Sequence, residues 1–312
     1  MATSAKLLVQ LRDAYVLLEE CISFRFEKER YLPSTKLSGK WYCKDVEIDE
    51  ILSLSLMLDG YFVHFGYPSA GTQTLVENGR CVLRVNSRGY SQALAQNQPT
   101  PGLVTSVNLE SIANSAIICP NVSYEQNSPA VRYVNYYDGT SIWDAIVCYC
   151  VRATGTYPYI RGINTVNISA IPSDVGALLV TPEHIVSSGA GSDFTNLISE
   201  ISEISYTGEY GGYHIFNQAA IDRSIIRKKE IPFDHEWVMD PDLGLATRVN
   251  YSMRRMNYRK FKIHGYYGGD LLDNFIVSYE NPYVSRISRI IVEGKNGDVF
   301  TTVYCYSDAY CG

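Results

Sequence analysis

Residues 136–169, YYDGTSIWDAIVCYCVRATGTYPYIRGINTVNIS, combine the clearest helix pattern of this 312-residue chain with a hairpin pattern that follows directly. Ser141 and Asp144, three residues apart, predict a capped helix start, because the serine oxygen accepts backbone N–H groups that the first turn leaves unpaired. Gly155 predicts the helix end, since glycine readily takes the left-handed conformation that closes helices. The segment therefore predicts one helix between Ser141 and Gly155.

The expected helix has one apolar face, because its apolar residues recur at intervals typical of helices. Two short β-type runs, 157–161 and 165–169, follow the helix, and the turn 162–164 joins them into a hairpin. A capped helix and a two-stranded ribbon cannot bury that face alone, so we expect them to pack against β-structure from the flanking chain. Trp143 lies beside the apolar face, which consists of Ile142, Ala145, Ile146, Tyr149 and Cys150.

The composition is typical of a folded globular protein, with 46% hydrophobic and 19% charged residues. The net charge of −6 provides no general attraction to nucleic acid or anionic membranes. The start of the chain, MATSAKLLVQLRDAYVLLEE, has too many charges and too short an apolar run for a secretion signal. No stretch approaches the roughly 20 apolar residues that a membrane span requires. We therefore expect a soluble protein made in a cytoplasm.

Eight cysteines are scattered through apolar segments, and in a reducing compartment such residues are usually buried free thiols. Cys148 and Cys150 have the wrong spacing for a metal or redox pair, and no second pair or histidine cluster accompanies them. We therefore expect no disulfide, no bound metal and no cofactor. The cysteines are Cys21, Cys43, Cys81, Cys119, Cys148, Cys150, Cys305 and Cys311.

Most of the remaining chain shows β-type patterns. Leucines alternate strictly at positions 52, 54, 56 and 58, and Asp59-Gly60 then predicts a hairpin turn. Two helix patterns, at 90–95 and 109–118, interrupt the strands, and prolines end both. We predict a mainly β protein with an α/β insert, divided into a first β-barrel at 1–95, the insert at 96–172, and a second β-barrel with C-terminal strands at 173–312.

Residues 173–312 combine β-type runs with many turns. The long stretch 249–264 is expected to be strand-rich, 208–213 to be a flexible turn region, and 189–192 to be a plain loop. The sequence KNGD at 295–298 predicts a tight hairpin turn between two strands.

No group of residues carries a catalytic signature. Gly189 and Gly191 lack the Gly-Lys-Ser/Thr sequence that completes a phosphate loop, and His235-Glu236 lacks the second histidine of a zinc-protease helix. The basic run 254–262 has interleaved aromatics, as some single-strand nucleic-acid grooves do. One isolated cluster in an acidic chain favours a strand with one solvated face instead. Carboxylates are plentiful, but nothing singles out a pair for glycoside hydrolysis.

Two motifs resemble those of a known family. The first, SRGYSQAL at 87–94, joins a serine and an arginine to a short helix pattern, and the proline-containing stop NQP at 97–99 follows. The second, DGTSIWDAI at 138–146, leads through a helix pattern into a glycine, an aromatic-proline strand and a hairpin. Both are similar to baseplate hub proteins of contractile phage tails, of the late control protein D type. The family-motif and packing positions are Ser87, Arg88, Ser141, Trp143, Ala145, Ile146 and Gly155.

The family is related to the hub part of the type VI secretion spike and recurs in tailocins, and the motifs cover the middle third of the chain. The resemblance implies two small β-barrels that flank a helix-plus-hairpin domain. Three copies would form a homotrimeric ring with pseudo-sixfold symmetry that joins the sixfold tail tube to the threefold central spike. Such a hub has no catalytic activity, binds no membrane and makes no specific nucleic-acid contacts.

The resemblance also implies a location and a set of partners. The protein would assemble in the bacterial cytoplasm and belong to the baseplate of a phage tail or a tailocin particle. Its partners would be the central spike protein, the tail tube, the tube-initiator protein, the tape measure and the inner baseplate wedge proteins. Because the chain ends soon after its last expected strand, we expect the spike to be a separate chain.

Two other functions are open from the residues alone. The chain has 25 tyrosines against 10 phenylalanines and many carboxylates, which would also suit a secreted or cytoplasmic β-rich carbohydrate-binding protein or glycoside hydrolase. A nucleic-acid-binding module would rest on the basic run 254–262 alone. The mass in solution and the neighbouring genes would separate these functions from the hub.

Overall fold

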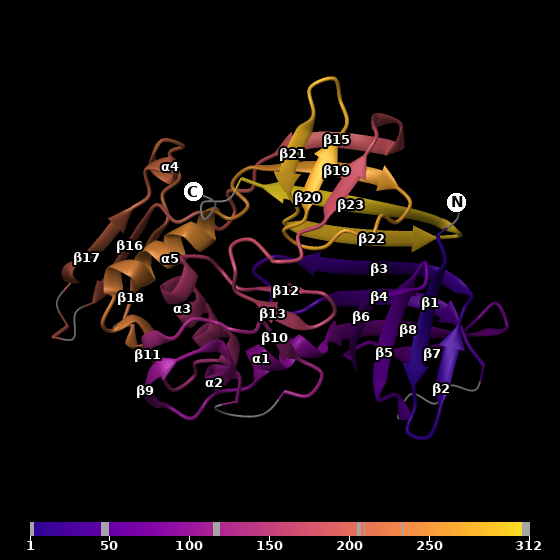
Figure 1. Ribbon diagram of the computed structural model, residues 1–312, viewed down its shortest axis with the longest axis horizontal. Helices are drawn as coiled ribbons and strands as arrows, with labels where there is room; N and C mark the ends of the chain where they lie inside the picture. The colour runs from indigo at the N-terminus through magenta and orange to yellow at the C-terminus, as the bar shows by residue number, and fades with distance from the viewer. Residues whose placement is uncertain are drawn as a thin grey trace.

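The computed structural model describes residues 3–44, 50–114, 119–204, 207–208, 210–232 and 234–307. Two expected features, the end of a helix at 115–118 and the thiol of Cys311, lie outside the described residues. Strands dominate the described chain, and the helices gather in the left half of Figure 1. The prediction of a mainly β protein with an α/β insert is confirmed.

The first β-unit is an antiparallel sheet, and three of the four leucines of the predicted alternation belong to its core, whereas Leu52 precedes the strand and is 48% exposed. Leu54, Leu56 and Leu58 are completely buried, and the predicted turn at Asp59-Gly60 leads into the next strand. The strands of this unit are β1 (Ala5–Gln10), β2 (Tyr15–Leu18), β3 (Cys21–Glu29), β4 (Lys36–Tyr42), β5 (Ser53–Leu58), β6 (Tyr61–Pro68), β7 (Gln73–Glu77) and β8 (Arg80–Gly89).

The second β-unit has two sheets that face each other across an apolar core. The rings of Phe261 and Phe275 lie 4.9 Å apart between these sheets. The predicted KNGD turn is confirmed, since Lys295 pairs with Asp298. The strands are β14 (Ala177–Val180), β15 (Ile185–Gly191), β19 (Tyr258–His264), β20 (Asn274–Val277), β21 (Tyr283–Arg286), β22 (Arg289–Lys295) and β23 (Asp298–Tyr306), and a 3-10 helix η3 (Pro182–His184) separates the first two.

Strands β3 and β22 join the two β-units edge to edge. They pair antiparallel, with Glu29 opposite Arg289 and Ser23 opposite Lys295. The result is one sheet of twelve strands whose path runs β15-β19-β23-β22-β3-β4-β8-β6-β5-β1-β2, with β7 attached to β8. Buried apolar residues of both units form one continuous core. The relative placement of the units is therefore held by backbone hydrogen bonds as well as by side chains.

The α/β insert is built around helix α3 (Ile142–Thr154), as the sequence predicts. Ser141 and Asp144 form a reciprocal capping box, and Gly155 ends the helix with φ of +71°. The apolar face of the helix is buried against the other elements of the insert. These elements are η2 (Tyr90–Gln92), α1 (Ala93–Gln96), β9 (Gly102–Val107), α2 (Leu109–Asn114), β10 (Ser123–Tyr124), β11 (Val131–Tyr136), β12 (Tyr159–Arg161) and β13 (Thr165–Asn167).

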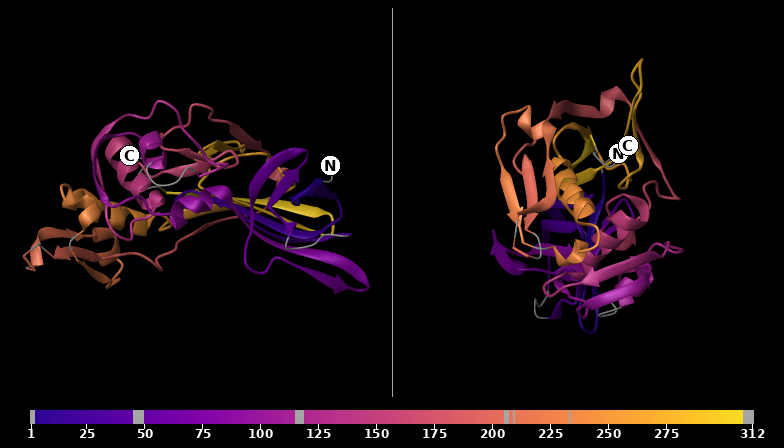
Figure 2. Two further views of the ribbon diagram at one scale, coloured as in Figure 1. Left: turned by 90° about the horizontal axis from the view of Figure 1, so that it is seen from below. Right: turned by 90° about the vertical axis from the view of Figure 1, so that its left-hand side faces the viewer.

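A second α/β unit interrupts the second β-unit. The sequence patterns of residues 173–312 did not predict it. In the left view of Figure 2 it lies at the end of the molecule opposite the first β-unit. Trp237 is buried in the core of the insert and so ties the two helical units together. The elements are β16 (Glu200–Ile204), β17 (Tyr210–Phe216), α4 (Gln218–Ile221), β18 (Lys228–Ile231), η4 (His235–Trp237) and α5 (Pro241–Met253).

Three expectations for this region are wrong. Residues 249–253 end helix α5 instead of starting a strand, because Pro241 opens a helix whose buried side chains, Leu245 and Val249, lie one turn apart. The expected turn region 208–213 lies partly in β17. The expected loop 189–192 lies mostly in β15, where Gly191 faces the Tyr258 ring so closely that a Cβ would meet it at 2.5 Å.

In the part of the chain that the structure describes, no helix is long and apolar enough to cross a membrane.

A substitution at Ile146 tests whether the apolar face of α3 packs in the insert core, because this side chain is completely buried there. We expect Ile146→Ala to lower the free energy of unfolding by about 2–5 kcal/mol, since the substitution leaves a cavity. Ile226→Ala is the matched control, because Ile226 is 94% exposed, and it should change stability by less than about 0.5 kcal/mol. Urea unfolding of both variants measures the difference. An Ile146→Asp variant that folds normally would contradict the assignment.

Candidate functional site

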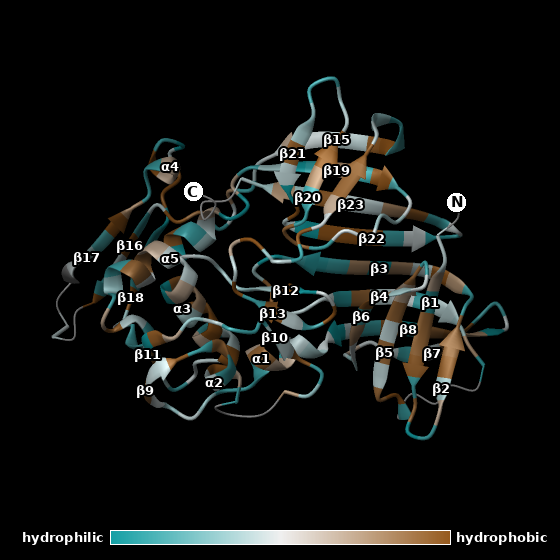
Figure 3. Ribbon diagram, viewed as in Figure 1, coloured by the Kyte–Doolittle hydropathy of each residue, from teal (hydrophilic) through white to brown (hydrophobic). Residues whose placement is uncertain are grey.

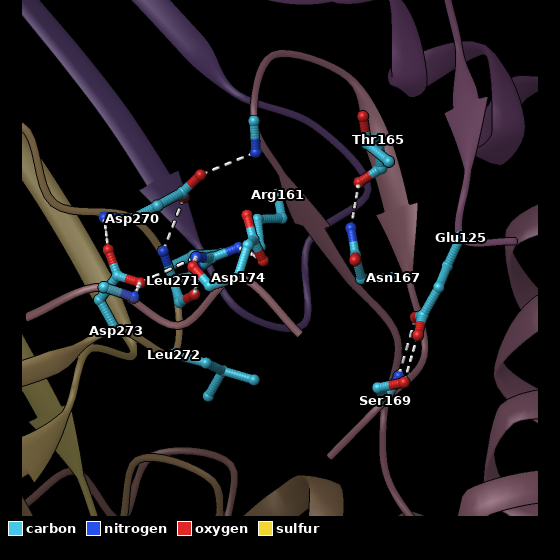
Figure 4. Close-up of polar contacts among 12 residues, drawn as sticks. Glu125, Arg161, Thr165, Asn167, Ser169, Asp174, Asp270, Leu271, Leu272 and Asp273 are labelled. Carbon is cyan, nitrogen blue, oxygen red and sulfur yellow. Dashed lines mark hydrogen bonds and ion pairs between the residues drawn. The ribbon is translucent and has the colours of Figure 1, made fainter. Parts of the chain in front are cut away.

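The tip of the β12–β13 hairpin, residues 161–164, lies where the insert meets both β-units (Figure 4). We call these four residues the hairpin tip. Gly162 has φ of +62°, in the left-handed region, so the predicted turn forms there without strain. The side chains and backbone groups of the tip make polar contacts to all three parts of the chain. We therefore take the hairpin tip, where the three parts of the chain are held together, as the candidate site.

Arg161 joins the insert to the second β-unit through a buried ion pair. Its Nη2 donates to Asp273 Oδ1 at 2.9 Å and to the Asp174 carbonyl at 2.7 Å. Its Nε donates to Asp174 Oδ1 at 2.8 Å, and its Nη1 donates to the Leu271 carbonyl. The side chains of Arg161 and Asp273 are only 8% and 9% exposed. Burial of both charges is tolerated because each hydrogen-bonding edge of the guanidinium finds an acceptor.

Asp273 is held in place by further backbone donors. Its Oδ1 also accepts from Gly176 N–H at 2.7 Å, and its Oδ2 accepts from Asp270 N–H at 2.8 Å. A Cβ at Gly176 would lie 3.1 Å from the carboxylate, so the absence of a side chain lets this backbone approach closely. The carboxylate is thus oriented before the guanidinium docks on it.

Lys28 connects the first β-unit to the same region. We call the contacts of the hairpin tip with Lys28, Asp270 and Asp273 the junction. Its ammonium group donates to the Gly162 carbonyl at 2.7 Å and pairs with Asp270 Oδ1 at 2.5 Å. Asp270 Oδ2 in turn accepts from Gly162 N–H at 2.7 Å. Burial lowers the pKa of Lys28, and the adjacent Asp270 carboxylate opposes that shift. Gly162 is therefore fixed through both of its backbone polar groups, one by each β-unit.

Asn164 provides the second contact with the first β-unit. Its Nδ2 donates to the Phe65 carbonyl at 2.9 Å, and its Oδ1 lies 3.4 Å from the backbone nitrogen of Ser91. A Cβ on Gly89 would lie 2.9 Å from Asn164 Oδ1, so a glycine is needed for this close approach. Gly89 belongs to the SRGYSQAL motif, which gives that motif a structural reason.

The base of the hairpin is also fixed by a carboxylate. Glu125 Oε2 accepts from the backbone N–H groups of Ile168 at 2.7 Å and Ser169 at 3.0 Å, and Oε1 accepts from the Ser169 hydroxyl. Figure 4 shows this contact on the far side of the hairpin from Arg161. Both ends of the ribbon are thus tied to neighbouring segments.

Ser87 lies in β8 and takes part in a buried hydrogen-bonded chain. His64 Nε2 lies 2.9 Å from Ser87 Oγ, His64 Nδ1 lies 2.8 Å from Thr35 Oγ1, and Ser87 Oγ donates to the Tyr67 carbonyl at 2.9 Å. Burial lowers the pKa of His64 to about 3. His64 is completely buried and Ser87 is 3% exposed, so this serine–histidine pair is a core contact that a substrate cannot reach.

The other predicted positions divide between two units. Arg88 is half-buried on β8, opposite Lys36 and Tyr67. Ser141, Trp143, Ala145, Ile146 and Gly155 cap, pack or end helix α3 in the insert. The first motif therefore spans the end of β8 and the insert elements η2 and α1, whereas the second motif belongs to the insert alone.

Cys148 and Cys150, on α3, are both buried. Burial raises the pKa of both thiols, and for Cys148 the Glu236 carboxylate, 3.8 Å away, adds to the effect. Among the residues that the structure describes, no group of three or more His, Cys, Asp or Glu residues could hold a metal ion.

The sequence did not predict the contacts of Lys28, Arg161, Asp270 and Asp273, although the pattern around Lys28 indicates a buried charge. Lys28 follows Phe24 and Phe26 at alternate positions of β3, and all three are buried on the same face. A lysine on the buried face of a strand requires a carboxylate partner. Asp270 and Asp273 could not be identified as that partner, because they come from a distant loop.

Comparison with known proteins assigns the fold. No family model and no curated protein sequence matches the chain. The tail protein from Neisseria meningitidis MC58 has a similar structure, with a TM-score of 0.69 at 13% identity and 98% of each chain covered. The prophage MuSo2 43 kDa tail protein from Shewanella oneidensis gives 0.67 at 11% identity, covering 98% of this chain and 99% of that chain.

A third similar structure is the E. coli c3393 protein, a component of the type VI secretion system that is structurally similar to the T4 tail proteins gp27 and gp5. Its TM-score is 0.60 at 9% identity, and the alignment covers 97% of this chain and 78% of that chain. The chain has a baseplate hub-like fold. The resemblance read from the middle third of the sequence thus extends, as fold, over nearly the whole chain.

The variant Arg161→Ala tests whether the ion pair with Asp273 holds the insert to the second β-unit. We expect Arg161→Ala to lower the free energy of unfolding by about 3–5 kcal/mol, because it leaves the buried Asp273 carboxylate without its counter-ion. Arg80→Ala is the matched control, since the Arg80 side chain is 54% exposed and pairs with the exposed Glu20 inside the first β-unit. Urea unfolding measures both variants. Equal, small losses would show that the junction does not hold the units together.

His64 gives the protein a specific pH dependence. Unfolded histidine binds a proton below its ordinary pKa of 6.5, whereas folded His64 does so only below about 3. Between these values protons favour the unfolded state, so stability falls as pH falls, by up to about 1.4 kcal/mol per pH unit from this residue. His64→Gln should remove that part of the slope in urea unfolding between pH 6.5 and 4.5. The exposed-surface variant His184→Gln should retain it.

Proposed function

We propose that this chain is a structural protein of a contractile tail or related injection particle, in which three copies form a ring between the tail tube and the central spike. The observation that carries the proposal is the similarity of the whole fold to tail proteins and to a type VI secretion component. Each chain contributes two β-units, so a trimer presents six. Six units suit a sixfold tube on one side, and three chains suit a threefold spike on the other.

A ring of identical chains requires two different surfaces that fit each other head to tail. The first candidate is the edge strand β2, whose outer backbone groups pair with no described strand. Tyr15 and Leu17 on this strand are 68% and 45% exposed, and Leu17 lies opposite the half-buried Leu8. Figure 3 shows the apolar character of β2 at the rim of the first β-unit. An exposed apolar edge strand is typical of a surface that another chain covers.

The second candidate surface is the outer face of the β14-β20-β21 sheet. Leu179 pairs with Ile276, which pairs with Val284, so these residues form one row across three strands. Leu179 and Val284 are each 59% exposed. We propose that this row contacts the β2 edge of the next chain in the ring. Apolar side chains at both surfaces would supply the buried core of that contact.

The proposal involves no catalytic step. Of the two arrangements that look chemical, Ser87 with His64 is a buried core contact, and Cys148 with Glu236 is a half-buried one; burial lowers the pKa of the histidine and raises that of the thiol. The proposed partners are further copies of the chain, the central spike, the tail tube with its initiator protein, the tape measure and the wedge proteins. The proposed place is the baseplate of a phage tail or tailocin particle that assembles in the bacterial cytoplasm.

Electron microscopy of the intact particle tests this function. We expect three copies of the chain between the tube and the spike. Leu17→Asp and Val284→Asp should each keep the chain folded but prevent its incorporation, because a buried unpaired carboxylate opposes the ring contact. Ile226→Asp is the control, since this exposed isoleucine lies outside both proposed surfaces.

A monomer in dilute solution is compatible with the proposal, because the spike can be needed for ring formation. Six copies per particle or a peripheral location would contradict it. Hydrolysis of a polysaccharide by the purified chain would favour the enzyme instead. Normal incorporation of both interface variants would contradict the surfaces but leave the trimer in place.

A further inference from the structure

Two cysteines meet at one end of the first β-unit. The Sγ atoms of Cys43 and Cys81 lie 3.1 Å apart, and Cys43 N–H donates to the Cys81 carbonyl at 3.1 Å. The two residues therefore continue the β4–β8 pairing by one position beyond Tyr42 and Val82. Directly opposite residues of antiparallel strands have Cα atoms about 4.5–5.5 Å apart, which is within the range that a disulfide spans.

The pair is also accessible to small molecules. Both cysteines line an open cleft of about 750 Å³ beneath β2, together with Leu17, Glu20 and Arg80. Cys81 is half-buried, whereas Cys43 is 6% exposed. A small oxidant in the cleft can thus reach the Cys81 sulfur first, because Cys43 is more deeply buried than Cys81.

We propose that Cys43 and Cys81 are a redox-active pair, which closes into a disulfide when a low-molecular-weight disulfide such as oxidised glutathione enters the cleft. The Cys81 thiolate attacks one sulfur of the oxidant, which forms a mixed disulfide and releases one glutathione thiolate. The deprotonated Cys43 sulfur then attacks Cys81 and releases the second glutathione. Two protein thiols are oxidised to one disulfide while one glutathione disulfide is reduced to two thiols.

The closed pair would fasten β4 to β8 beside the edge strand β2. In a reducing cytoplasm the pair stays open, which agrees with the free thiols expected for the protein as it is made. After transfer to an oxidising medium the cross-link would restrict the unfolded chain and so stabilise the folded one. The proposal does not depend on the proposed function.

The experiment uses the full chain with Cys311→Ser, which removes the thiol outside the described residues and leaves seven of the eight cysteines. The protein is purified reduced, incubated with oxidised glutathione, quenched with acid and analysed by intact mass and by non-reducing peptide mapping. We expect one species lighter by two hydrogen atoms, with a linked peptide pair that contains Cys43 and Cys81. Its thermal unfolding midpoint should be higher than that of the reduced protein.

Matched variants sharpen the result. Cys81→Ser and Cys43→Ser should each abolish the linked species and the redox-dependent midpoint, whereas Cys305→Ser should retain both, and circular dichroism checks that each variant is folded. In 8 M urea, a concentration chosen to unfold the chain, the equilibrium constant for closure should fall at least about tenfold, because the strands no longer hold the thiols together. A stable glutathione adduct on Cys81, a link between other cysteines, or equal closure in urea would overturn the proposal. The mapping of the unsubstituted pair decides the question even if a variant does not fold.

Discussion

The ion pair between Arg161 and Asp273 sets the geometry on which the rest of the molecule depends. Two opposite charges are withdrawn from water beside the hairpin tip, where the insert contacts both β-units. Such burial is costly unless every donor and acceptor is used, and here backbone groups from Asp174, Leu271 and Gly176 complete the set. This arrangement favours the observed relative orientation of the units, because a displacement would weaken the hydrogen bonds to the buried Asp273 carboxylate.

The shared sheet and the hairpin tip restrain the same joint in different ways. The β3–β22 ladder fixes the two β-units along their common edge. The tip contacts Lys28 and Phe65 on one side and Asp270 and Leu271 on the other, so it spans that edge from outside the sheet. The β3–β22 ladder opposes sliding of the two β-units along their common edge, and the hairpin tip, which contacts both units, opposes bending between them. The place between a tail tube and a spike proposed above would require this property.

Local signals account for what could be predicted from the sequence. Helix α3 and its hairpin were identified because Ser141, Asp144, Gly155 and the turn residues act over a few positions, and the structure places them as expected. Helix α5 was missed because its buried positions are few and separated by Asp, Arg and Asn, so its periodicity is weak. The buried partner of Arg161, Asp273, lies more than a hundred positions away, and no local pattern connects the two. The β-rich class was therefore predictable, whereas the junction was not.

The pairing of β3 with β22 has a consequence for how the chain is made. Glu29 is synthesised 260 residues before Arg289, yet the two lie opposite each other in the same ladder. Until the C-terminal strands are synthesised, β3 presents an unpaired edge beside apolar side chains such as Phe24 and Phe26. Contacts between residues so far apart in sequence form slowly, and an open strand edge recruits foreign strands in the meantime. The nascent chain thus carries an open strand edge that is prone to aggregation until β22 pairs with it.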